Sequence, residues 1–295
     1  MHLIRKNGWL ISLAMLVISV EVPGQGRQGR QGGQIVTSEE KTFSVSGTPT
    51  VRTSTFDGHI RIEASDQPVV RCSIEKRGRS QEDIDPIQVE AVQDGNIITV
   101  DARVRSRVRF NSSASANITL TLPRQANLVA RTGDGGIEAR DLTGEIELNT
   151  GDGKINASNL HGKLNVHTGD GSVDLMDVAG QLRARTGDGG MHIRGRFDAL
   201  EVSTGDGPID ITVERGSTMS GPWAIKTGDG SVQLALPEDF SAELDIHTND
   251  GSINSDLPLT LSGKIQGNSL RSRLNQGGAT LTVHTGDGSI TLRRS

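Results

Sequence analysis

The sequence is poor in aromatic residues and in cysteine. Of its 295 residues, two are Trp, five are Phe, none is Tyr and one is Cys. This scarcity excludes a row of aromatic platforms on which bases or sugars could stack. The single thiol, Cys72, cannot form an intrachain disulfide, and its alternation with Val70 and Ile74 predicts a small, buried apolar side chain.

Apolar residues are also few, at 33% of the chain against a usual share of ~45–50%. A thick core of large side chains is therefore excluded. Glycine is abundant instead, with 37 residues, well above its usual share of about 7%. Acidic residues (36) outnumber Lys and Arg (31), which gives a net charge of −5. Such a chain is no general nucleic-acid binder, so no specific nucleic-acid partner is expected.

The N-terminus has the features of a secretory signal. Arg5 and Lys6 precede the apolar run Trp9–Val20, which is too short for a transmembrane helix of ~20 residues. We expect residues 1–24 to be a signal peptide that directs the protein to the periplasm, the cell envelope or the exterior. Retention as an uncleaved anchor is the alternative, and it is the only membrane contact that the sequence predicts. Residues 25–38, rich in Gly and Gln, are expected to form a flexible spacer.

A repeat dominates the second half of the chain. The motif Thr-Gly-Asp-Gly begins at Thr132 and recurs every 18 residues as far as Thr204. Further copies begin at Thr227, at Thr248 (as Thr-Asn-Asp-Gly) and at Thr285. Small or aliphatic residues alternate after glycines that are nine residues apart, so each unit is expected to contain two short strands with one buried face.

We therefore predict an all-β fold, a parallel β-helix-like solenoid whose two-strand coils of ~18 residues turn at Thr-Gly-Asp-Gly corners. Regular coils are expected over residues 128–295, capped by an irregular β part over residues 39–127. A thin coil accepts small aliphatic residues and Thr, and its corners need glycine. A long antiparallel meander with Gly-Asp hairpins is the alternative, but it needs something to cover its apolar face. The coil after Thr285 is expected to end the stack.

Short motifs outside the strict repeat indicate a family. The pattern Val-Arg-Thr-x-x-x-Asp-Gly-x-Ile begins at Val51, and Leu-x-Leu-Pro ends at Pro123 and again at Pro237, each time before a strand and a corner. With these motifs the chain resembles, over roughly residues 39–295, the bacterial DUF4097 family of adhesin-like proteins with β-strand repeats. The resemblance implies a right-handed parallel β-helix-like fold in an envelope or secreted protein. It implies no catalytic residues.

The aspartates of the corners are the first candidate site. Stacked coils would bring these carboxylates close together, which is costly unless they are solvated, hydrogen-bonded or bridged by a cation. Either each Asp accepts backbone N–H bonds at its own corner, or the row binds Ca²⁺, the only cofactor that the sequence suggests. The row consists of Asp134, Asp152, Asp170, Asp188, Asp206, Asp229, Asp250 and Asp287.

A second candidate is a row of arginines. Arg103, Arg105, Arg107 and Arg109 occupy alternate positions, which would place four guanidinium groups on one face of one strand. Either they form a solvated face paired with acidic residues, or they contact an anionic polymer: lipopolysaccharide phosphate, an acidic polysaccharide or extracellular DNA.

The residues just before the corner threonines form a third, partly basic row, expected to pair with acids such as Asp174 and Glu201. Its histidines, His167, His247 and His284, are coils apart in the sequence, so we expect no metal site from them. Trp223 takes the place of Leu164 in the repeat and is expected in the core.

The sequence thus predicts a non-enzymatic, extracytoplasmic, adhesin-like module that binds a surface polymer or an envelope protein. The alternatives are a calcium-binding module similar to a β-roll, or a β-helical enzyme that acts on polysaccharides. No Ser/His/Asp, Cys/His or convergent carboxylate set stands out from the repeat, which argues against the enzyme.

Overall fold

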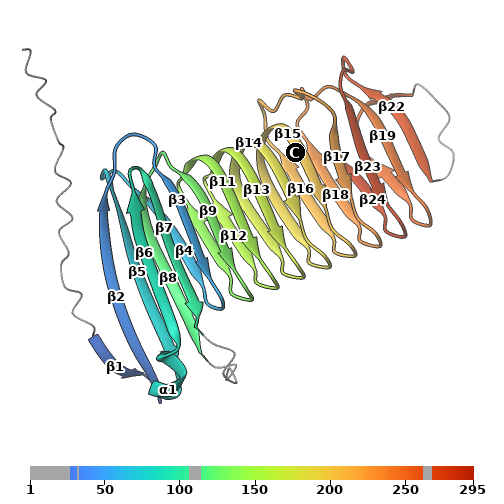
Figure 1. The fold of residues 1–295 in the computed structure, drawn as a ribbon. Coiled ribbons are helices and arrows are strands. Elements are labelled where there is room, and N and C mark those ends of the chain that lie inside the picture. Colours follow the sequence, from blue (N-terminus) through green and yellow to red (C-terminus); the bar gives the residue numbers. More distant parts are fainter. Residues whose placement is uncertain (1–26, 32, 106–113, 262–267) are drawn as a thin grey trace, which may run out of the picture.

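The computed structural model describes residues 27–31, 33–105, 114–261 and 268–295 (Figure 1). The expected signal peptide, residues 1–24, lies outside them. The described chain is all-β: its strands join into one 24-stranded sheet, and the one helix in these ranges, α1 (Gln81–Ile84), is a single turn. None of the described residues forms a helix long and apolar enough to cross a membrane.

The strands form two stacks, which β14 (Val173–Arg185) and β15 (Met191–Ser203) join because each contributes one half to each stack. The first stack runs in spatial order through β6 (Ile87–Asp94), β7 (Ile97–Val104), β3 (Thr50–Thr55), β9 (Asn127–Thr132), β11 (Thr143–Thr150), β13 (His161–Thr168), the second halves of β14 and β15, β17 (Trp223–Lys226), β23 (Thr280–Thr285), β19 (Ala242–Thr248), β22 (Ser269–Leu274) and β21 (Leu259–Leu261).

The second stack contains the strands that follow the corners. Its spatial order is β1 (Arg27–Gln31), β2 (Gln34–Ser44), β5 (Val69–Gly78), β8 (Ser115–Pro123), β4 (Ile60–Ser65), β10 (Ile137–Arg140), β12 (Ile155–Ser158), the first halves of β14 and β15, β16 (Ile209–Val213), β18 (Val232–Leu236), β24 (Ile290–Arg294) and β20 (Ile253–Ser255). We call one strand of the first stack, the corner after it and the next strand of the second stack a rung.

Strands of successive rungs pair in parallel through the repeat region. Thr150 pairs with Thr168 in the first stack, and Ile155 pairs with Val173 in the second, each 18 residues further on. Figure 1 shows these strands side by side along the molecule. The parallel pairing excludes the antiparallel meander for this region, because a meander would reverse each successive strand.

The core is thin and continuous between the two stacks. In β13, Leu164, Val166 and Thr168 are buried, whereas the residues between them are exposed, as the period-two pattern predicts. Val, Ile, Leu and Ala make up most of the buried cluster. Trp223 is only 1% exposed, and its ring packs on Phe197 and Phe240 with centroids 6.3 Å and 5.2 Å away, so its predicted core position is confirmed.

The rungs near the C-terminus do not follow sequence order. Strand β23 lies between β17 and β19, and β24 lies between β18 and β20. The rung after Thr285 is therefore interior, and the expectation that it ends the stack is wrong. Instead, β22 and β21 pair antiparallel at that end of the first stack.

Near the N-terminus, too, the spatial order of the strands departs from their order in the sequence. The rung of β3 and β4 lies between the later pair β7 and β8 on one side and β9 and β10 on the other. Both ends of the repeat region are thus built by strands that are distant in sequence.

Part of the expected spacer is structured. Residues 27–31 form β1, and residues 34–38 begin β2, which pairs with β5 from Ile35–Gly78 to Ser44–Val69. Here the structure corrects the sequence expectation. Strand pairing uses backbone N–H and C=O groups, so a segment rich in polar residues can still add to a sheet edge.

Cys72 is 2% exposed in β5, which confirms the predicted buried, small apolar role. Burial raises the pKa of its thiol to about 12, with a smaller contribution from Glu39.

Candidate functional site

The corners between the stacks are held by their threonine hydroxyls. Thr168 ends β13 with its side chain buried, and its Oγ1 donates to the carbonyl oxygen of Gly153 in the preceding rung at 2.9 Å. The same Oγ1 accepts the N–H of Gly171 in its own corner at 3.2 Å. Equivalent donations to a neighbouring rung come from Thr132, Thr150, Thr186, Thr204, Thr227, Thr248 and Thr285.

The corner aspartates lie outside this network. All eight predicted positions are exposed, and within the described ranges their carboxylates accept no hydrogen bond. The capping role proposed for them from sequence belongs to the threonines, because strand alternation turns Thr inward and leaves Asp on the surface. Oδ1 of Asp170 lies beside the next rung, 2.8 Å from where a Cβ on Gly187 would stand.

The aspartate row follows the spatial order of the rungs. Asp287 therefore comes between Asp229 and Asp250, since Thr285 pairs with Thr248 and β23 also pairs with β17. Asp57 adds a further corner carboxylate beside Asp134, because Thr55 pairs with Thr132. No group of three or more His, Cys, Asp or Glu side chains suited to a metal ion occurs among the residues with described positions.

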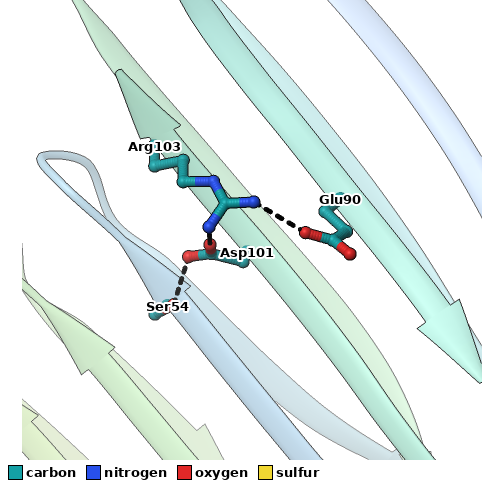
Figure 2. Close-up of polar contacts among 4 residues, drawn as sticks. All are labelled: Ser54, Glu90, Asp101 and Arg103. Carbon is teal, nitrogen blue, oxygen red and sulfur yellow. Dashed lines mark hydrogen bonds and ion pairs between the residues drawn. The ribbon is translucent and has the colours of Figure 1, made fainter. Parts of the chain in front are cut away.

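The predicted arginine row is only partly described. Arg103 in β7 lies between two acids, with Nη2 at 2.8 Å from Glu90 Oε2 and Nη1 at 3.6 Å from Asp101 Oδ2 (Figure 2). Asp101 also accepts the Ser54 hydroxyl (Figure 2). Arg105 is exposed just after β7, whereas Arg107 and Arg109 lie outside the described residues. At Arg103, the geometry favours a solvated, ion-paired face over a free anion-binding group.

Ion pairs between rungs cover much of the outer surface of the first stack. Arg131 Nη2 lies 2.7 Å from Glu147, and the guanidinium groups of Arg183 and Arg185 both reach Glu201, at 2.6 Å and 2.5 Å. The hydrogen bond from Arg185, followed by that from Arg183, lowers the pKa of the Glu201 carboxyl. The predicted pairing of this row with Glu201 is confirmed, whereas the predicted pairing with Asp174 is wrong, because Asp174 lies on the second stack and contacts Lys154 there.

Two histidines of the same row are adjacent in space. His247 pairs with His284 across β19 and β23, and their rings stack with centroids 5.3 Å apart and planes 4° apart. Sequence reasoning placed them coils apart, which is wrong because the last rung is inserted before β19. His247 Nε2 also lies 3.2 Å from Asn249 Oδ1.

A shallow groove of about 330 Å³ crosses the outer surface of the second stack. It is lined by side chains from five successive rungs, so it runs along the stacking direction. One side of the groove is formed by the residue that directly follows the corner in each rung. The first of these residues is Lys154, and the others are small or compact: Ser172, Gly190, Pro208 and Ser231. The groove exists where these positions lack large side chains.

The opposite side of the groove is polar and charged. Asp174, His192, Asp210 and Gln233 occupy the same strand position in successive rungs. Lys154 Nζ lies 3.6 Å from Asp174 Oδ2, and His192 Nδ1 lies 3.8 Å from Asp210 Oδ2.

Asp210 has a cationic partner as well. Its Oδ1 is hidden from solvent and makes no hydrogen bond within the described residues, but Arg293 Nη2 forms an ion pair with it at 3.7 Å. Sequence reasoning missed this groove, although one signal was present: small residues recur just after the corners at Ser172, Gly190 and Ser231.

Comparison with solved structures finds several matches at low sequence identity. A candidate adhesin from Parabacteroides merdae has a TM-score of 0.47 and 13% identity, covering 86% of this chain and 95% of that one. A candidate adhesin from Bacteroides fragilis has a TM-score of 0.35 and 16% identity, covering 88% and 97%. A candidate lipid binding protein from Parabacteroides distasonis has a TM-score of 0.40 and 11% identity, covering 86% and 96%.

A search of curated proteins found no match. The family model described as Toastrack DUF4097, in contrast, matches residues 51–293, from β3 to within β24. This range includes the groove, the threonine-linked corners and both ends of the repeat region, where the strand order departs from the sequence order. The chain therefore belongs to the Toastrack DUF4097 family.

Proposed function

We propose that the chain is a non-catalytic β-solenoid that binds a linear surface polymer along the groove of its second stack. One observation carries the proposal: five successive rungs contribute, in register, to a single groove that follows the long direction of the stack. An elongated polymer fits such a surface better than a compact ligand does, because its repeating units can meet equivalent positions of successive rungs.

The rigidity of the corners supports this function. Each rung is fixed to its neighbours by strand pairing and by a buried threonine hydroxyl such as that of Thr168. A surface that is already ordered loses little conformational entropy when it binds a ligand.

Location and partner follow from the same proposal. The basic residues Arg5 and Lys6 before the apolar run Trp9–Val20 support export from the cytoplasm, where the chain would meet envelope or surface polymers. The adhesin-like role implied by the family resemblance agrees with binding of this kind.

Filling the groove tests the function. We would measure binding of the full chain to an immobilised panel of neutral, amino-bearing and acidic polysaccharides, for the wild type and for Ser172→Phe and Ser231→Phe. Both serines are exposed, so phenylalanine occupies the groove without entering the core. Asn165→Phe, on the outer face of the first stack, is the matched control.

We expect the groove variants to lose polymer binding and the control to keep it. Equal binding by all three variants would refute the groove as the site. Shortening of a bound polymer would instead indicate the enzyme alternative, and it is measured in the same samples by size-exclusion chromatography.

A further inference from the structure

We infer that His247, His284 and Asn249 form a site for a divalent transition metal ion such as Zn²⁺. The inference goes beyond the proposed function, because these residues belong to the first stack and the groove lies on the second. Imidazole nitrogens are common ligands of such ions. The two histidines are distant in the sequence, and insertion of the last rung makes them neighbours.

The two imidazoles stand side by side on one surface. His247 in β19 and His284 in β23 are direct partners in a parallel ladder, so their side chains leave the same face of the sheet about 4.8 Å apart. Their ring centroids are 5.3 Å apart and their planes differ by 4°. His247 is exposed and His284 is half-buried, so an ion can reach both from solvent.

Asn249 supplies a second, independent observation. In the Thr-Gly-Asp-Gly corners the residue after Thr is Gly, and at Gly286 a Cβ would lie 2.5 Å from a carbonyl oxygen of the neighbouring rung. Among the corners of the repeat, only the one that begins at Thr248 carries a polar side chain in this place. The departure from Gly therefore puts an amide oxygen at the same corner as the histidine pair.

The spacing of Asn249 and His247 suits one metal ion. Asn249 Oδ1 lies 3.2 Å from His247 Nε2. Two donor atoms at this separation can both lie about 2.1 Å from one ion, with an angle of about 100° at the metal, which is close to tetrahedral. The ion then takes the place of the proton shared by this pair. Asn268 Nδ2 donates to the backbone carbonyl oxygen of Asn249 and holds the corner in position.

His284 is the third donor. Its ring lies beside that of His247 and must turn toward Asn249 for a nitrogen to reach the same ion. Within the described part of the chain the His284 ring makes no hydrogen bond, so this turn breaks none. Water completes an open, four-coordinate site. The bound ion links β19 to β23, the first strand of the inserted rung.

Coordination, rather than net charge, has to select the ion. Lys226 pairs with His284 on the side away from His247, and it makes no ion pair with any described residue. The exposed corner carboxylates Asp250 and Asp287 offset this positive charge. A site with two imidazoles in such balanced surroundings favours a transition metal over Ca²⁺ or Mg²⁺, which prefer oxygen ligands.

The test is calorimetric titration of the untagged full chain with Zn²⁺, with Ca²⁺ and Mg²⁺ in parallel. The variants are His247→Ala, His284→Ala and Asn249→Gly, the last of which restores the residue found at the Thr-Gly-Asp-Gly corners. The matched control is His167→Ala, an exposed histidine of the same row whose neighbours in the ladder are not histidines. Circular dichroism checks that each variant is folded.

We expect one Zn²⁺ per chain and no comparable binding of Ca²⁺ or Mg²⁺. Each of the two histidine variants should weaken Zn²⁺ binding at least tenfold, and Asn249→Gly several-fold, with less than a twofold change in the control. Zn²⁺ should also raise the melting temperature of the wild type and leave that of His284→Ala unchanged, because binding stabilises only a fold that contains the site.

Unchanged Zn²⁺ binding in His247→Ala and His284→Ala would show an adventitious ion elsewhere on the chain and overturn the inference. Equal losses in these variants and in His167→Ala would also overturn it, as would the absence of Zn²⁺ binding by the wild type. Tight Ca²⁺ binding that Asn249→Gly abolishes would assign the corner to an oxygen-seeking cation and overturn the transition-metal site.

Discussion

The hydroxyl of Thr168 donates to the carbonyl oxygen of Gly153 at 2.9 Å, and this bond crosses from one rung to the next inside the corner. Because the same oxygen atom of Thr168 accepts the N–H of Gly171, one buried side chain fixes both the shape of its corner and the position of the adjacent one. The bond recurs along the row, so the corner threonines act as a continuous internal link between rungs.

Replacing Thr168 by valine tests this link. Thr168→Val keeps the shape of the side chain but leaves a buried carbonyl and a buried N–H without their partner, so we expect a loss of about 1–3 kcal/mol in the free energy of unfolding. Thr168→Ser keeps the hydroxyl and loses one methyl group, at a cost of about 0.8 kcal/mol. Urea titration followed by circular dichroism measures both, and a valine variant as stable as the serine variant would contradict the role of the bond.

The backbones of neighbouring corners lie very close together, which leads to a second prediction. A Cβ on Gly171 would lie 2.6 Å from the carbonyl carbon of Gly153 and nearer still to its oxygen. Because backbone must move to relieve this overlap, Gly171→Ala should cost about 2 kcal/mol or more. Gly221 has open space around its Cβ position, so Gly221→Ala is the control and should change stability by less than ~0.5 kcal/mol. Thermal unfolding of the two variants would settle the matter, and equal melting temperatures would refute the steric argument.

The repeat and its inward positions could be predicted from the sequence because they follow from local spacing. Residues 18 apart do pair, and Leu164, Val166 and Trp223 point inward as the alternation indicates. The order of the last rungs could not be predicted in this way. The units at Thr227, Thr248 and Thr285 carry similar corners, so which of them are neighbours depends on long-range packing that leaves no local pattern.

The groove was missed for a related reason. It depends on outward residues such as Gly190 and Asp210, whose identities the strand period does not constrain. Only when the rungs are in register do these separate residues form one surface. The stacked pair His247 and His284 likewise exists only because β23 is inserted beside β19.

Because the last rung is inserted between earlier ones, we expect strand β24 to be unusually well protected from hydrogen exchange. Terminal segments normally fray, but β24 has hydrogen-bonded neighbours on both sides, β18 and β20. Hydrogen exchange followed by mass spectrometry should find Ile290 and its neighbours in β24 as protected as β18, with the edge strand β20 exchanging faster. Equal, rapid exchange in β24 and β20 would contradict the observed order of the rungs.

The thiol of Cys72 should be inert in the folded protein. Its pKa is raised to about 12 by burial, so little thiolate exists at pH 8 and the reaction with a disulfide reagent should be about a thousandfold slower than for an ordinary cysteine. Denaturant should restore full reactivity, because unfolding returns the thiol to water. Complete labelling of the native protein within minutes would show that β5 opens readily or that the thiol is accessible.

Substitution of Asp170 tests whether the corner carboxylates repel one another or form a row of calcium sites. The corner carboxylates recur once per rung, at a usual strand spacing of ~4.8 Å, and none of those described is hydrogen-bonded or ion-paired. Asp170→Asn should therefore raise stability by a few tenths to about 1 kcal/mol at low ionic strength, by relieving like-charge repulsion. The gain should shrink in high salt, because exposed charges are screened.

The control for Asp170→Asn is Asp245→Asn, which removes a carboxylate that is paired with Arg271 and should bring no gain. Thermal unfolding is measured with millimolar Ca²⁺ and with a chelator. A row of calcium sites would reverse the sign: Ca²⁺ would raise the melting temperature of the wild type, and Asp170→Asn would lower it because a ligand is lost. Stabilisation by Asp170→Asn in both solutions would leave repulsion between corners as the dominant effect of the row.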